Sequence, residues 1–114
     1  MKHYMRLNPE PFELIRSGKK TVELRLFDEK RRLLKIGDEI EFTCTNIDTG
    51  CIVCRVEELY RFDSFRELYK SLPLSECGYT EDNISSASYK DMEKYYSPDE
   101  QKNYGVVGIK LRLI

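Results

Sequence analysis

Apolar and polar residues alternate along five stretches of the chain, as they do in strands that bury one face. In the third stretch, for example, Ile40, Phe42 and Cys44 alternate with charged or hydroxyl side chains. The five stretches cover residues 2–7, 20–26, 39–44, 51–60 and 104–114. A turn at 46–50, with the sequence NIDTG, separates the third stretch from the fourth and predicts an antiparallel hairpin.

Three short helices are predicted where apolar residues at helical spacing follow capping residues. They lie within 8–17, 64–72 and 89–103, and the last of these segments contains a second capping signal, Ser97 followed by Pro98. Residues 73–88 are rich in Ser, Gly, Asp and Asn, so they predict a loop with little regular structure.

The order of these elements indicates the fold class. Strands joined by hairpins, without regular strand-helix alternation, argue against a doubly wound parallel sheet. The expected class is α+β: a small, mostly antiparallel, partly closed β-barrel of about five strands with about three short flanking helices. A chain of 114 residues can bury one modest core, so residues 1–114 are expected to form a single domain.

Composition indicates the cellular location that is expected for the chain. Hydrophobic residues make up 40% and charged residues 34%, which is typical of a globular domain. No apolar run approaches the roughly 18 residues needed to span a bilayer. The start of the chain, MKHYMRL, lacks the apolar segment of a signal peptide. We therefore expect a cytoplasmic location and no membrane partner.

Charge is distributed unevenly along the chain. Residues 1–35 hold ten basic and five acidic side chains, a net charge of +5, whereas residues 36–114 hold nine and fifteen, a net charge of −6. A basic N-terminal third can form a patch that attracts phosphates even when the whole chain is near neutral. A surface of mixed charge is the simpler alternative.

The spacing of two cysteines matches that of metal and redox sites, but their predicted positions argue against such a site. Cys51 and Cys54 have C-x-x-C spacing, but they fall in a predicted strand, where their side chains point to opposite faces. With a single histidine, His3, the sequence favours free thiols, and no metal is expected. Neither Gly-rich phosphate loop, G-x-G-x-x-G or G-x-x-x-x-G-K-[ST], occurs, and no cofactor is expected.

Polar chemistry is concentrated in the stretch SGKKTVELR, residues 17–25. On a strand Thr21, Glu23 and Arg25 share one face, headed by Lys20, while the residues between them supply an apolar face. The polar face is then either solvated or the floor of a polar pocket. Arg25 could bind a phosphate or a base edge, and Glu23 could accept from an exocyclic amine such as that of cytosine.

The same stretch resembles a known family. It fits the pattern G-x-K-x-x-E-x-R at Gly18, Lys20, Glu23 and Arg25, by which ASCH domains of the PUA-like superfamily are identified. A Gly-Asp turn before a strand and a C-terminal YGVVGIKL stretch are similar to that family too. The resemblance implies a PUA-like β-barrel with a cleft into which the Lys, Glu and Arg project, and a role in binding RNA or a nucleoside or nucleotide.

Several roles remain open for these side chains. As a binding site, the cleft would use Lys20, Thr21, Glu23 and Arg25. As a hydrolase of a modified nucleoside or RNA, amidohydrolase-like or ribonuclease-like, it would use Lys20 and Glu23 as catalytic residues. The family that this chain resembles includes a small bacterial amidohydrolase, whose motif has a threonine nucleophile at the position of Glu23. Glu23 could instead neutralise its basic neighbours in a structural ion pair.

Two further groups of residues could extend such a site. Lys30, Arg31 and Arg32 form a basic loop that could track a phosphate backbone or could be a solvated connection. Tyrosines could stack on bases, although their spacing favours packing in the core or against helices for most of them. These tyrosines are Tyr89, Tyr95, Tyr96 and Tyr104. A protein partner docking on the basic loop or on 73–88 is the remaining alternative.

Overall fold

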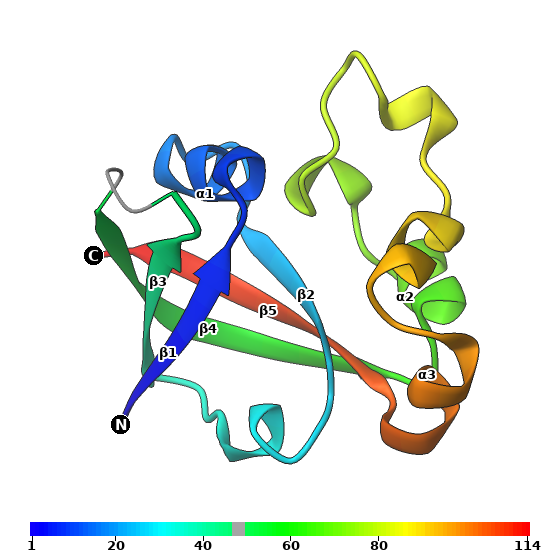
Figure 1. The fold of residues 1–114 in the computed structure, drawn as a ribbon, viewed down its shortest axis with the longest axis horizontal. Helices are drawn as coiled ribbons and strands as arrows, with labels where there is room; N and C mark the ends of the chain where they lie inside the picture. Colours follow the sequence, from blue (N-terminus) through cyan, green and yellow to red (C-terminus); the bar gives the residue numbers. More distant parts are fainter. Residues whose placement is uncertain (47–49) are drawn as a thin grey trace.

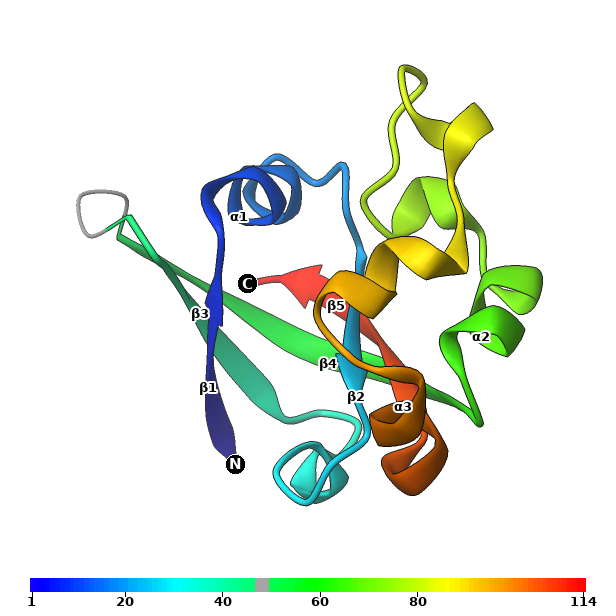
Figure 2. The ribbon, with the colours of Figure 1, turned by 45° about the vertical axis from the view of Figure 1, so that its right-hand side comes forward.

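The computed structural model describes residues 1–46 and 50–114. Along the chain the elements are β1 (Lys2–Leu7), α1 (Pro9–Arg16), β2 (Val22–Leu26), η1 (Arg31–Leu33), β3 (Glu39–Cys44), β4 (Cys51–Phe62), α2 (Phe65–Ser71), η2 (Leu74–Glu76), η3 (Ile84–Ser86), η4 (Tyr89–Lys94), α3 (Pro98–Tyr104) and β5 (Val106–Leu113). The elements marked η are 3₁₀ helices. Figures 1 and 2 both show α1 beside one end of a curled sheet, and the chain from α2 to α3 grouped beside β2 and β5.

Within the described residues, five strands form one sheet in the order β1-β3-β4-β5-β2. The pairs β3–β4, β4–β5 and β2–β5 are antiparallel, which confirms the mostly antiparallel, partly closed barrel. β1, however, pairs with β3 in parallel. The chain passes through α1, β2 and η1 between these two strands, so a parallel neighbour is reached without a hairpin. The predicted 46–50 turn includes 47–49, which lie outside the described residues.

Two apolar clusters cover opposite sides of the sheet. One lies inside the curl beneath α1 and includes Phe12, Ile40 and Phe42. The other joins the apolar face of β2 to α2 through Phe65 and Leu68. Because the second cluster covers β2 from outside, the opposite face of that strand points into the curl.

The chain between α2 and β5 is more regular than the sequence indicated. The predicted loop at 73–88 contains the 3₁₀ helices η2 and η3. The predicted helical segment 89–103 divides into η4 and α3, each beginning with a capping box, at Ser88 and at Ser97. None of the described helices is both long and apolar enough to cross a membrane.

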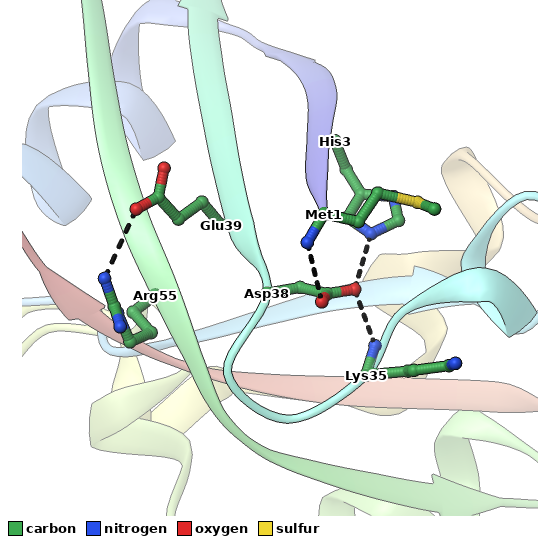
Figure 3. A network of polar contacts seen from close by, with 6 residues as sticks. All are labelled: Met1, His3, Lys35, Asp38, Glu39 and Arg55. Carbon is green, nitrogen blue, oxygen red and sulfur yellow. Dashed lines mark hydrogen bonds and ion pairs between the residues drawn. The ribbon is translucent and has the colours of Figure 1, made fainter.

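The predicted Gly-Asp turn fixes the start of β3 against β1 (Figure 3). Asp38 accepts from His3 Nε2 at 2.8 Å and from the backbone amide of Lys35 at 3.1 Å, and its other oxygen lies 3.3 Å from the Met1 amino group. The hydrogen bond from His3 is the main reason that the pKa of Asp38 is lowered. These contacts brace the end of the sheet where the parallel pair begins.

Candidate ligand-binding cavity

The motif side chains of β2 form a buried ion-pair network. Glu23 Oε1 lies 2.8 Å from Lys20 Nζ, and Glu23 Oε2 accepts from Arg25 Nε at 2.7 Å. Glu23 is 4% exposed and Lys20 is 9% exposed. A carboxylate this deeply buried is stable only when charged partners satisfy it, and here each of its oxygens has one.

Burial and charge act in opposite directions on the Glu23 carboxyl group. Burial alone would raise its pKa, but the charges and hydrogen bonds of Lys20 and Arg25 outweigh that effect and lower the pKa to about 2. Glu23 is therefore ionised at neutral pH. It can orient Lys20 and Arg25, and it has no proton to donate as a general acid.

The local backbone explains how Lys20 becomes buried. Its amide donates to the Leu14 carbonyl at the end of α1, which fixes the chain between helix and strand. Its aliphatic stem then runs along Gly78, where an added Cβ would lie 3.2 Å from Lys20 Cδ. Gly78 has a φ of +109°, a backbone conformation that favours glycine, so a bare backbone at this position leaves room for the lysine.

Arg25 spans the gap between the edge strands β2 and β1. Its Nη2 donates to the Arg6 carbonyl at 2.9 Å, and Lys30 Nζ donates to the Tyr4 carbonyl at 3.0 Å. Both acceptors are carbonyls of β1, whose strand partner β3 lies on its other side. The two cations therefore satisfy polar groups on an edge of the sheet that pairs with no further strand among the described residues.

A cavity of about 350 Å³ opens over this network. The residues that line it come from the end of β1 and from α1, from Lys20 and β2, from the residue after β3, from α2, and from the segment between α2 and α3. They are Arg6, Leu7, Asn8, Glu10, Pro11, Leu14, Lys20, Glu23, Leu24, Arg25, Thr45, Tyr69, Cys77, Gly78, Tyr79, Met92, Tyr95 and Tyr96. Cationic groups therefore line one part of the cavity, and the rings of Tyr69, Tyr79, Tyr95 and Tyr96 form an aromatic wall on another part.

The aromatic wall contains a chain of hydrogen bonds that sequence reasoning missed. Tyr79 donates to Asp91 Oδ2 at 2.6 Å, and the hydroxyl groups of Tyr69 and Tyr79 lie 2.8 Å apart. Asp91 also accepts from the Ser88 amide as part of the η4 capping box. The Ser-x-x-Asp spacing was a signal for that cap, but no pattern links Asp91 to tyrosines from two other segments.

The other predicted site residues lie away from the cavity. Thr21 precedes the first residue of β2, and its hydroxyl donates to Glu76 at 3.1 Å, where Lys110 also donates. The side chains of the basic loop make intramolecular contacts: Arg31 pairs with Asp28, and Arg32 donates to the Tyr104 carbonyl. In the described part of the chain, neither Thr21 nor the basic loop contributes to the cavity lining.

The remaining candidates are the tyrosines and cysteines. Tyr95 and Tyr96 line the cavity, whereas Tyr89 and Tyr104 line a separate groove.

Cys51 is exposed and Cys54 is buried, in agreement with their opposite strand faces. Burial raises the pKa of the Cys54 thiol to about 11. Among residues 1–46 and 50–114, no group of three or more His, Cys, Asp or Glu side chains could hold a metal.

In the described residues, the curled five-stranded half-barrel with its flanking helices is a PUA-like fold. Residues 5–114 match the profile of the ASCH domain, and the chain belongs to that family. The resemblance carried by the G-x-K-x-x-E-x-R motif is thus confirmed.

Solved structures give the same fold. The crystal structure of hypothetical protein PH0355 is 33% identical with a TM-score of 0.82, and each chain covers 100% of the other. The solution structure of protein PF0455 from Pyrococcus furiosus is 32% identical with a TM-score of 0.75, over 100% of this chain and 98% of that one. ASCH from Zymomonas mobilis has a TM-score of 0.67 at 22% identity, covering 96% of this chain and 65% of that one. No curated protein matches the sequence.

Proposed function

We propose that the cavity binds one nucleotide unit, either free or as part of a single-stranded RNA. The observation that carries this proposal is the buried Lys20–Glu23–Arg25 network at the base of a cavity with an aromatic wall. Cations that recognise acceptor groups and rings that cover a flat base are the usual components of single-strand recognition. The resemblance to ASCH domains also implies a role in binding RNA.

The charges of the lining residues favour an anionic or acceptor-rich ligand. Lys20, Arg25 and Arg6 supply three positive charges, against the negative charges of Glu23 and Glu10. Because Glu23 uses its charge on two of the cations, it also fixes their donor groups in one orientation. Lys20 keeps donors beyond the one that faces Glu23, and Arg25 keeps a guanidinium edge.

The size of the cavity limits the ligand to a small group. Small-molecule pockets range from about 300 to 1,000 Å³. At about 350 Å³, this cavity lies near the lower end of that range. It suits a base with its ribose or phosphate and is too small for a double helix.

Hydrolysis in the same cleft remains the alternative, with Lys20 as base and Glu23 orienting it. The structure offers less for a threonine-based amide cleavage, because the Thr21 hydroxyl donates to Glu76 outside the cavity. Binding requires only the charges and surfaces that are present. We therefore place binding first and treat turnover as a separate measurement.

Salt dependence tests this proposal. A labelled single-stranded RNA of about eight nucleotides should bind with an affinity that falls moderately with salt, because a pocket for one nucleotide neutralises one or two phosphates. For single strands this predicts a slope of log affinity against log salt of about −0.7 to −1.4. Product analysis of the same mixtures measures turnover.

Four results are distinguishable in that experiment. The expected slope without new products supports binding as the function, and new RNA fragments support the hydrolase alternative. A slope steeper than about −3 would indicate several phosphate contacts and favour the basic loop over the cavity. No binding at low salt would contradict the proposed function altogether.

A further inference from the structure

The direction of the hydrogen bonds in the aromatic wall follows from the chemistry of its last member. A carboxylate has no proton, so Asp91 can only accept, and the single hydroxyl proton of Tyr79 is used in donating to it. The hydrogen bond from Tyr79 is also the main reason that the pKa of Asp91 is lowered. Tyr79 must then accept from Tyr69 across the 2.8 Å between their oxygens.

This order of donation leaves Tyr69 with its only proton already committed. Burial raises the pKa of Tyr69 to about 12, so its hydroxyl group remains protonated at neutral pH. What its oxygen can still offer a ligand is an acceptor position. Tyr69 lines the cavity together with Lys20 and Arg25, which carry donors only.

The lining residues of the cavity therefore combine donors, on Lys20 and Arg25, with a hydroxyl group on Tyr69 whose oxygen can only accept from a ligand. Resting on the nucleotide binding proposed above, we propose that the Tyr69 oxygen accepts a hydrogen bond from the ligand and selects nucleobases with an exocyclic amine. Cytosine and adenine present an N–H₂ donor where uracil and hypoxanthine present a carbonyl oxygen. A carbonyl placed against Tyr69 would bring two acceptors together with no proton between them, which is unfavourable in a buried site.

Glu23 is another acceptor beside Lys20 and Arg25 in the cavity, but each of its two oxygens already accepts from one of these cations. Removing the Tyr69 hydroxyl group therefore separates its contribution from that of Glu23. A substitution of Tyr79 gives a second, independent test of the role of Tyr69. In Tyr79→Phe the proton of Tyr69 is released, and its hydroxyl group becomes able to donate to a carbonyl.

Matched ligand pairs test the inference by isothermal titration. CMP with UMP, and AMP with IMP, each exchange an amine for a carbonyl at one ring position. Wild-type protein should bind the amine member about 5-fold more tightly, the ratio that one net hydrogen bond supplies. Tyr69→Phe should reduce the ratio to about 1, and Tyr79→Phe should reduce or invert it.

Tyr89→Phe is the matched control, since it removes a hydroxyl group from η4 in a residue that lines the separate groove. Its ratio should equal that of the wild type. A wild-type preference that persists in both Tyr69→Phe and Tyr79→Phe would overturn the role of Tyr69, and so would equal binding of both members by the wild type. If the wild type binds none of the four nucleotides, the proposed function itself is wrong.

Discussion

Replacing Glu23 by Gln is expected to lower the free energy of unfolding at pH 7 by about 3–5 kcal/mol. The exchange keeps the shape of the side chain but removes the charge that two buried cations share. Lys20 is 9% exposed and the Arg25 side chain 13%, so water can replace little of the lost interaction. Chemical denaturation of the variant and the wild type measures the difference.

The pH dependence of the same two proteins gives an independent check. The pKa of Glu23 is lowered from an ordinary value of 4.5 to about 2. A carboxyl group with a lowered pKa contributes its full stability above its unfolded pKa, and loses it as the pH falls through the folded one. Wild-type stability should therefore decline between pH 4.5 and pH 2, and this part of the decline should be absent from Glu23→Gln.

Glu81→Gln is the control for both measurements, because Glu81 is exposed in the segment between η2 and η3. Its effect on the free energy of unfolding should stay within about 0.5 kcal/mol. Equal free energies of unfolding for Glu23→Gln and the wild type would show that Glu23 does not stabilise a buried pair of cations.

The second large effect is expected on binding. Lys20→Met should weaken binding of CMP and of single-stranded RNA by about 10- to 100-fold, since a hydrogen bond to a charged group contributes about 1.5–3 kcal/mol. Methionine keeps an aliphatic stem beside Gly78, and Arg25 still pairs with Glu23. Titration calorimetry measures the affinities, and thermal melting confirms that the variant is folded.

The neighbouring lysine provides a control with the same change of charge. Lys19 is exposed, whereas Lys20 is buried in the cavity. Lys19→Met should bind CMP as the wild type does. If the two variants lose equal affinity, general charge attraction and not the cavity would account for binding.

Alternation along the chain was sufficient to predict the strands and the face on which Glu23 and Arg25 lie. It could not show what covers that face, because the covering residues follow much later in the sequence. Gly78 and Tyr79 arrive through η2, and Tyr95 and Tyr96 follow η4. Burial of the network, and with it the low pKa of Glu23, is therefore a property of tertiary contacts.

Local patterns also failed where a residue stands at the end of an element. Strand periodicity grouped Thr21 with Glu23, but β2 begins at Val22 and Thr21 turns to Glu76 instead. The basic run looked free to meet phosphates, yet Lys30 and Arg32 donate to backbone carbonyls far away in sequence. A run of basic residues in a sequence shows that charge is present, but the fold determines which groups these charged side chains contact.

The parallel pairing of β1 with β3 was missed for a related reason. In a sequence, a hairpin is indicated by a short run of turn-forming residues, as NIDTG at 46–50 predicts before the fourth strand. A parallel neighbour is reached after an intervening stretch, here the whole segment from α1 to η1. No local signal specifies which later strand will pair with β1.

Amide chemical shifts in a titration of ¹⁵N-labelled protein with CMP locate the binding site directly. Binding in the cavity predicts that the largest changes occur within residues 20–25, 77–79 and 92–96, which contain most of its polar and aromatic lining. Changes confined to the basic loop at 30–32, or to the separate groove near Tyr89, would contradict binding in the cavity. No change at any residue up to millimolar CMP would contradict nucleotide binding itself.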